Sequence, residues 1–157
     1  MFQLLSIFIN EEKAFAHCDI PCGIYDPHLA QVAAHTVIRM TKLLSEVKNT
    51  DVKTQHDIAR MTQVKEKHAG IMEEELETLR NDYFKEDHYK QFPNLQKLFT
   101  DTLKSISTVR QSIDMEESQS VLEGVMEIAE IFYKSKNVTP VRVKSVYPTE
   151  GEIVVYK

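Results

Sequence analysis

The chain has no tryptophan, only four glycines and only two cysteines among its 157 residues. Two cysteines exclude a disulfide-dense scaffold. A bond between Cys18 and Cys22 would close a very small ring and gain little loop entropy. The scarcity of glycine, together with many Glu, Lys, Leu and Met residues, favours helices. A single domain of this length buries about two-thirds of its unfolded surface, so it needs no covalent staple.

Long hydrophobic runs and blocks of basic residues are also missing. The apolar segment Phe2–Ile9 has eight residues, far fewer than the ~20 that a membrane-spanning helix needs. The net charge is −5, and binding to a phosphate backbone depends on clustered Lys and Arg. We therefore expect neither a membrane nor a nucleic acid as a partner.

Residues 1–16 have the pattern of a removable leader. Ala14-Phe15-Ala16 is a small-residue pattern behind which peptidases cut, and the cut would make His17 the N-terminus. No Lys or Arg precedes Phe2–Ile9, and charged residues separate that segment from the cut, which disfavours export. We expect a cytoplasmic protein, with secretion through a signal-like leader as the alternative. An uncleaved N-terminal helix packed on the body is the alternative to cleavage.

Four apolar stripes at helical spacing predict four antiparallel helices over residues 28–136. The expected helix starts are Asp26-Pro27, Thr50-Asp51, Pro93 and Asp114, the last with a capping-box spacing to Glu117. The second helix is expected to run to about Tyr83, followed by a connection over Phe84–Tyr89. His35, His56 and His88 are expected on the surface or at helix flanks.

The composition changes after Asn137, where segments of β-branched and aromatic residues are interrupted by two prolines. Residues 138–157 are expected to form an extended tail or a weak β-hairpin. Such a tail would pack on the body, pack on a neighbouring subunit or stay mobile, because a lone hairpin is marginally stable. The predicted fold is thus all-α: an antiparallel four-helix bundle with an N-terminal hook (17–27) and a short C-terminal extension (138–157).

The densest chemistry lies in residues 17–27, His-Cys-Asp-Ile-Pro-Cys-Gly-Ile-Tyr-Asp-Pro. After cleavage, a terminal amine, an imidazole, a backbone amide and two thiols would lie within six residues. Zinc sites usually take four protein ligands, and one cysteine pair supplies only two. Square-planar nitrogen and sulfur donors suit Ni(II) or Cu(II). Pro21 and Gly23 allow the run to fold back on itself.

In this spacing, residues 17–27 resemble the nickel-binding hook of the nickel superoxide dismutase family. Asp82-Tyr83-Phe84-Lys85, followed by His88 and Pro93, resembles that family's second signature. The similarity extends over about residues 17–136. It implies a homohexamer of four-helix bundles, made as a precursor that a maturation protease trims. It also implies conversion of superoxide to dioxygen and hydrogen peroxide by Ni(II)/Ni(III) cycling.

The resemblance assigns roles to individual residues. It implies one nickel ion per subunit, bound by the amine and imidazole of His17, the amide and thiolate of Cys18, and the thiolate of Cys22. Tyr25 and Tyr83 would line a small pocket near the vacant face of the metal. The resemblance also makes Asp19 and Lys85 supporting residues.

The chain departs from the family where a Glu and an Arg brace the axial histidine, since an ungapped count places Ala33 and His68 at these positions. The residues around the axial histidine are therefore expected to differ from those of the family. Such partners of metal ligands tune the properties of the metal.

Two other hypotheses fit the residues. The hook could store or deliver nickel or copper without turnover. Alternatively, the chain could be a helical interaction module whose cysteines form a local disulfide.

Overall fold

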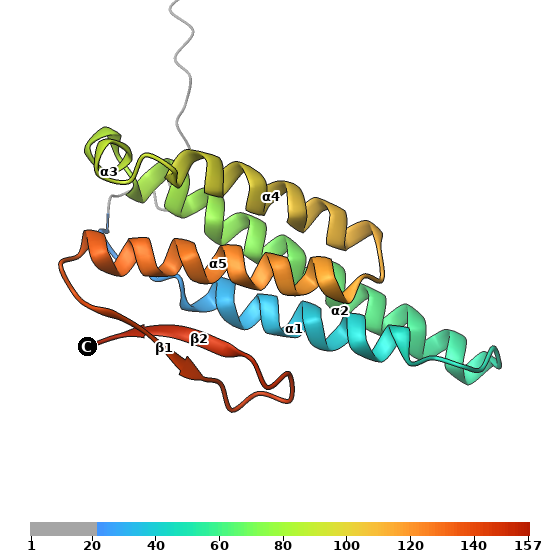
Figure 1. Ribbon diagram of the computed structural model, residues 1–157. Coiled ribbons are helices and arrows are strands. Elements are labelled where there is room, and N and C mark those ends of the chain that lie inside the picture. Colours follow the sequence, from blue (N-terminus) through green and yellow to red (C-terminus); the bar gives the residue numbers. More distant parts are fainter. Residues whose placement is uncertain (1–21) are drawn as a thin grey trace, which may run out of the picture.

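The computed structural model describes residues 22–157 and contains a four-helix bundle with a small β-hairpin beside it (Figure 1). The four long helices are α1 (His28–Ser45), α2 (Val52–Thr78), α4 (Leu95–Gln111) and α5 (Met115–Ser135). The π-helical turn η1 (Leu79–Tyr83) continues α2, and the short helix α3 (Glu86–Gln91) precedes α4. The strands β1 (Pro140–Lys144) and β2 (Glu152–Tyr156) follow α5. The predicted helical fold with a short β-hairpin is confirmed.

All four long helices contribute to one core. Its largest fully buried side chains are Phe99, Met72, Leu76, Leu79, Leu95, Ile106 and Ile128. α1 packs against α2 and α5, and α4 packs against α2 and α5, as expected for four antiparallel helices. The helices therefore alternate in direction, and the start of α1 lies at the same end of the bundle as the ends of α2 and α5.

Acidic side chains lie at the starts of three long helices, α1, α2 and α5, as the sequence predicts. Asp51 Oδ1 accepts a hydrogen bond from the Thr54 amide at 3.0 Å, and Asp114 Oδ1 accepts one from the Glu117 amide at 3.0 Å. α1 begins one residue later than expected, after Pro27, and Asp26 Oδ1 accepts from the His28 amide at 2.7 Å. Each bond satisfies a backbone donor that has no partner within the helix.

The segment predicted as a connection over Phe84–Tyr89 is partly helical, so that prediction is wrong. α3 begins at Glu86, and the ring nitrogen Nδ1 of His88 accepts from the Lys85 amide at 3.0 Å. Glu86 and Asp87 place negative charge in the first turn, which stabilises a helix start. Six residues are too few to produce the repeated apolar stripe by which longer helices are recognised.

The hairpin packs on the bundle below α1 and α5 (Figure 1). β1 and β2 are antiparallel, with Arg142 opposite Val154 on the inner face. Val154 is completely buried, and Arg142 forms ion pairs of 2.6 Å with Glu123 and with Glu130 on α5. These charged hydrogen bonds raise the pKa of the Arg142 guanidinium. Of the arrangements that the sequence left open for the tail, packing on the body is the observed one.

Two side chains of α1 hold the hairpin. The amide of Gln31 bonds both backbone groups of Val154, donating to its oxygen at 3.1 Å and accepting from its nitrogen at 2.6 Å. His35 is 3% exposed, contrary to the expected surface position. Its Nε2 lies 3.0 Å from the Glu152 carbonyl oxygen and its Nδ1 2.7 Å from Thr149 Oγ1. Burial beneath the hairpin lowers the pKa of His35.

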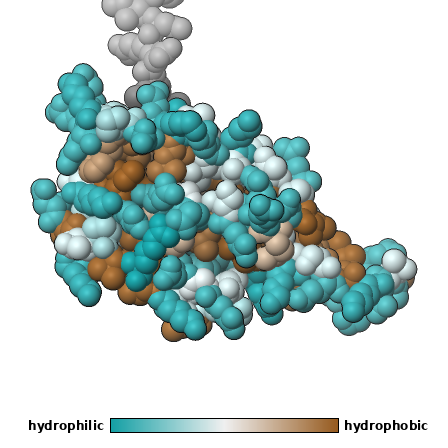
Figure 2. Space-filling view, in the orientation of Figure 1, coloured by the Kyte–Doolittle hydropathy of each residue, from teal (hydrophilic) through white to brown (hydrophobic). Residues whose placement is uncertain are grey.

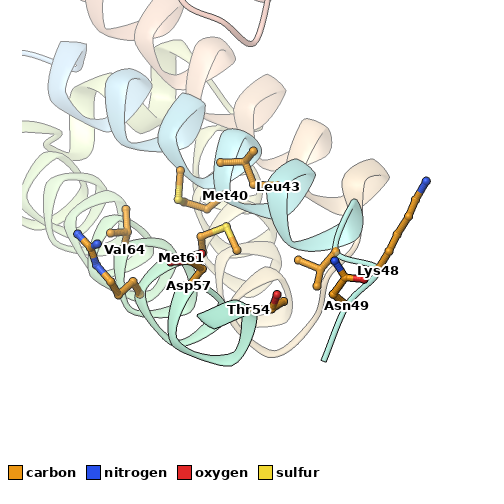
Figure 3. A pocket seen from close by; sticks show the side chains of 10 residues that line it. Met40, Leu43, Lys48, Asn49, Thr54, Asp57, Met61 and Val64 are labelled. Atoms are coloured by element: carbon orange, nitrogen blue, oxygen red, sulfur yellow. The ribbon is translucent and has the colours of Figure 1, made fainter. Parts of the chain in front are cut away.

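The end of the bundle where α1 meets α2 projects beyond α4 and α5 (Figure 1). A cavity of about 540 Å³ lies there between the two helices, with Met40 and Met61 facing it beside Asp57 (Figure 3). α1 has 18 residues and is therefore about 27 Å long, which separates this cavity from the hook's end of the bundle.

The visible face of the molecule is largely hydrophilic with separate apolar patches (Figure 2). Among the described residues, no helix is both long and apolar enough to span a membrane.

Candidate metal centre

The candidate centre lies where the chain enters α1. His17, Cys18 and Asp19 fall outside the described residues, so Cys22 is the one expected nickel ligand that the structure describes. Cys22 is exposed, with its Sγ 4.0 Å from the Ile24 carbonyl oxygen. Gly23 has a φ of +71°, in the left-handed region that side chains rarely adopt. The residue directly after the cysteine thus has the backbone freedom that the sequence predicts for Gly23, while the fold-back of the preceding residues stays a prediction.

Tyr25, two residues after Gly23, meets Tyr83. Their ring centroids are 5.5 Å apart with an interplanar angle of 53°, and both side chains are half-buried against the core. Tyr25 comes from the segment before α1, and Tyr83 is the last residue of η1. The structure therefore joins the two sequence motifs in space, while the roles of these tyrosines toward a metal stay a prediction.

The π-helical turn explains how Tyr83 is presented. Turns of this kind insert an extra residue into a helix and are frequent at functional sites. Phe84 leaves the turn in an extended conformation and is buried, so the chain changes direction directly after Tyr83. The Tyr83 ring packs on Phe132 at 4.6 Å and stacks on His88 at 5.4 Å. Aromatic contacts at such distances hold the ring on several sides.

The end of α5 supplies contacts to Tyr83 that the sequence analysis missed. The Tyr83 hydroxyl lies 2.6 Å from Ser135 Oγ, and Lys136 Nζ lies 4.7 Å from the Tyr83 ring centroid. This proximity can be predicted only from the alternating directions of the helices, which place the ends of α2 and α5 together. The spacing of residues within either helix gives no indication of it.

Lys85 contacts the π-helical turn through its side chain. Its side chain is exposed, and its Nζ donates to the Asn81 carbonyl oxygen at 3.3 Å. Tyr83 and Lys85 of the second motif therefore differ in environment, one packed on the core and the other in solvent. An exposed cation near a site can attract an anion by steering.

A cavity of about 360 Å³ lies beside Tyr25, between the segment that leads into α1 and the end of α2. Its lining includes Ile24, Asp26 and His28 from one side and Thr78 and Leu79 from the other. Ile24 is 78% exposed, so apolar surface of the hook itself faces solvent.

The two positions that depart from the family pattern have contrasting environments. Ala33 is buried in the core, and a methyl group supplies no hydrogen bond. His68 is half-buried on α2, with Nδ1 2.8 Å from the carbonyl oxygen of Val64 in the preceding turn. One ring nitrogen of His68 is thus engaged by its own helix, and Ala33 cannot replace a bracing carboxylate.

Within residues 22–157, no group of three or more His, Cys, Asp or Glu side chains is arranged to hold a metal ion. The part of the chain that the structure describes therefore contains no rival to the hook. The fold and site together define a small helical bundle with a cysteine-bearing segment and paired tyrosines at one end.

The chain belongs to the nickel-containing superoxide dismutase family, whose model matches residues 12–136. It is 33% identical over 134 residues to Superoxide dismutase [Ni] of Streptomyces seoulensis and 34% identical over 134 residues to that of Streptomyces coelicolor. Each match covers 85% of this chain and 98% of the relative.

Solved structures agree with this membership. Native nickel superoxide dismutase at 1.30 Å is 35% identical, with a TM-score of 0.68 over 76% of this chain and 99% of the other. A nickel-containing superoxide dismutase with nickel ligation corresponding to the oxidised state is 33% identical, with a TM-score of 0.69 over 77% of this chain and 99% of the other. The family match ends at Lys136, so β1 and β2 lie beyond it.

Proposed function

We propose that the protein is a nickel-dependent superoxide dismutase whose metal centre forms at residues 17–22 once the leader has been removed before His17. The observation that carries this proposal is the meeting of Tyr25, three residues after Cys22, with Tyr83 of the second motif at 5.5 Å. Family membership supports the same reaction.

The residues fit a nickel ion. Cys22 is exposed and is followed by Gly23 in the left-handed region, so its sulfur is accessible to a metal ion. The donors would be the amine and imidazole of His17, the amide and thiolate of Cys18, and the thiolate of Cys22. Nitrogen and thiolate donors of this kind suit Ni(II). A bound nickel ion supplies the Ni(II)/Ni(III) couple by which two superoxide ions and two protons yield dioxygen and hydrogen peroxide.

The surrounding side chains have separate tasks. Tyr25 and Tyr83 form a wall beside the hook that narrows access to it and orders water. Lys136 places positive charge over the Tyr83 ring, and exposed Lys85, two residues after Tyr83, adds a second cation that attracts the superoxide anion by steering. Asp19, which lies outside the described residues, would be a supporting residue of the hook.

The decisive experiment joins the mass of the mature chain, its nickel content and superoxide decay followed by stopped flow. We expect a chain that starts at His17, about one nickel per chain, and rapid decay that Cys18→Ser and Cys22→Ser each abolish. His17→Gln is compared with His56→Gln, which alters an exposed histidine on α2. Nickel binding without superoxide consumption would overturn the proposal in favour of a storage or delivery protein.

The assembly, maturation and location of the protein are part of the same proposal. We propose a homohexamer in the cytoplasm, produced after a protease cuts behind Ala16. Ile24 and Leu29, which are 78% and 48% exposed beside the site, are the kind of apolar surface that a neighbouring subunit covers. Light scattering on the purified mature protein tests the hexamer, and cell fractionation tests the location. A monomer, or recovery outside the cytoplasm, would contradict these parts.

A further inference from the structure

Two short oxygen–oxygen contacts at the end of α5 determine where the hydroxyl proton of Tyr83 lies. Tyr83 Oη is 2.6 Å from Ser135 Oγ, and Ser135 Oγ is 2.7 Å from the carbonyl oxygen of Phe132. Contacts of this length between oxygens require a hydrogen in each gap. The carbonyl contributes none, so the serine hydrogen occupies the gap to Phe132. The tyrosine hydrogen must then occupy the gap to Ser135.

The ring of Tyr83 is held firmly enough to keep this geometry. Phe132 packs on it at 4.6 Å, Tyr25 at 5.5 Å and His88 at 5.4 Å, while the Lys136 ammonium lies over it at 4.7 Å. Rotation of the phenol would break several of these contacts at once. The donated hydrogen bond is therefore a fixed property of the site.

We propose that Ser135 is a positioning residue that engages the Tyr83 hydroxyl proton, so that Tyr83 offers the metal pocket a hydrogen-bond acceptor and withholds a donor. This inference rests on the proposed function, which gives Tyr83 its place beside the hook. A phenol oxygen whose single proton is engaged still has acceptor capacity. It can accept from water or hydrogen peroxide, which carry O–H groups.

Superoxide at neutral pH carries no proton and can only accept hydrogen bonds. Tyr83 held in this way therefore does not bind superoxide directly, and a water molecule must stand between them. The arrangement discriminates between substrate and product, since hydrogen peroxide has protons to donate and superoxide has none. Ser135 sets this preference without touching either molecule.

Spectroscopy of the nickel-free protein tests the hydrogen bond itself. The tyrosine Fermi doublet in the ultraviolet resonance Raman spectrum distinguishes a phenol that donates from one that accepts. The chain has six tyrosines, so subtraction of the Tyr83→Phe spectrum isolates Tyr83. We expect Ser135→Ala to change the isolated doublet and Ser135→Thr, which keeps the hydroxyl, to restore it. Ser120→Ala, which alters an exposed serine on the same helix, is the matched control.

Kinetics of the mature, nickel-loaded protein test the consequence. Loss of the Ser135 hydroxyl frees the phenol proton of Tyr83 to donate a hydrogen bond to superoxide. The free energy of a hydrogen bond to a charged group is equivalent to about a tenfold fall in KM. We expect Ser135→Ala to lower KM by that factor without raising kcat, and Ser135→Thr to stay within about twofold of the parent. An unchanged doublet in Ser135→Ala would overturn the inference. A Ser135→Thr variant with the same doublet and KM as Ser135→Ala would also overturn it.

The two proposals fail in different ways. A protein that shows the Raman change but consumes no superoxide refutes the proposed function and supports the hydrogen bond. A protein that consumes superoxide normally, with the same doublet and the same KM in Ser135→Ala, refutes the role of Ser135 alone.

Discussion

Replacement of Gln31 by leucine tests how the C-terminal hairpin is held. The Gln31 side chain is completely buried and bonds both backbone groups of Val154, at 3.1 Å and 2.6 Å. Leucine fills a similar volume but supplies neither a donor nor an acceptor. One N–H and one C=O group of Val154 would then be buried without partners. Each such group costs ~1–3 kcal/mol, so we expect a total of about 2–4 kcal/mol after the gain from burying leucine.

The protein can escape this cost by releasing the hairpin, since the four helices retain most of the core. The loss in the free energy of unfolding is then limited to the free energy of hairpin docking. The direct readout is hydrogen exchange of the Val154 amide, measured by NMR. A destabilisation of about 2 kcal/mol corresponds to about 30-fold faster exchange. We expect at least this acceleration in Gln31→Leu, with little change in the helices.

Gln63→Leu, which alters an exposed glutamine on α2, controls for the change of residue type. Equal exchange of the Val154 amide in Gln31→Leu and in the parent would show that the glutamine amide does not hold β2. The reasoning from buried partners would then be refuted.

Three further substitutions test other contacts. Burial lowers the pKa of His35, so the unfolded chain binds its proton more readily than the folded protein. The free energy of unfolding in urea should therefore fall as the pH drops below about 6.5, and His35→Gln should remove this loss. An added Cβ at Gly124 would collide with Thr102 Oγ1 where α4 and α5 approach. We expect Gly124→Ala to cost about 1–3 kcal/mol, and Thr102→Ala to restore stability in the double mutant. Buried Lys65 donates from α2 to the carbonyl groups at the end of α4. Lys65→Met should cost about 1–3 kcal/mol by chemical denaturation, whereas exposed Lys67→Met should cost almost nothing.

Local chemistry made much of the fold predictable. The helix caps Asp51 and Asp114 are predictable because each capping bond joins residues only three apart. The burial of His35 is not predictable from the sequence, because it depends on Thr149, 114 residues later in the chain. No pattern around His35 reveals that the tail returns to cover it. The same distance hid the role of Gln31, a polar residue on a helix face that the hairpin buries.

The candidate site was predictable where its residues form short motifs. Cys22, Gly23 and Tyr25 lie close together in one motif, and Tyr83 stands in a second compact motif. Ser135 belongs to neither motif, and the run Lys134–Lys136 fits the placement of positive charge at a helix end without any further role. Its contact with Tyr83 follows from the directions of α2 and α5, which only the assembled bundle fixes.

The last residue of the chain returns to the place where the hairpin began. The Lys157 amide donates to the Thr139 carbonyl oxygen at 3.0 Å, and the Thr139 amide donates to the Lys157 carbonyl oxygen at 3.4 Å. The two ends of the hairpin segment, Thr139 and Lys157, therefore lie side by side. Anything attached after Lys157 would emerge near the end of α5, at the end of the molecule that carries Tyr83. A fluorescent label at this position would sit at the same end of the bundle as Tyr83 and at the opposite end from the cavity between α1 and α2.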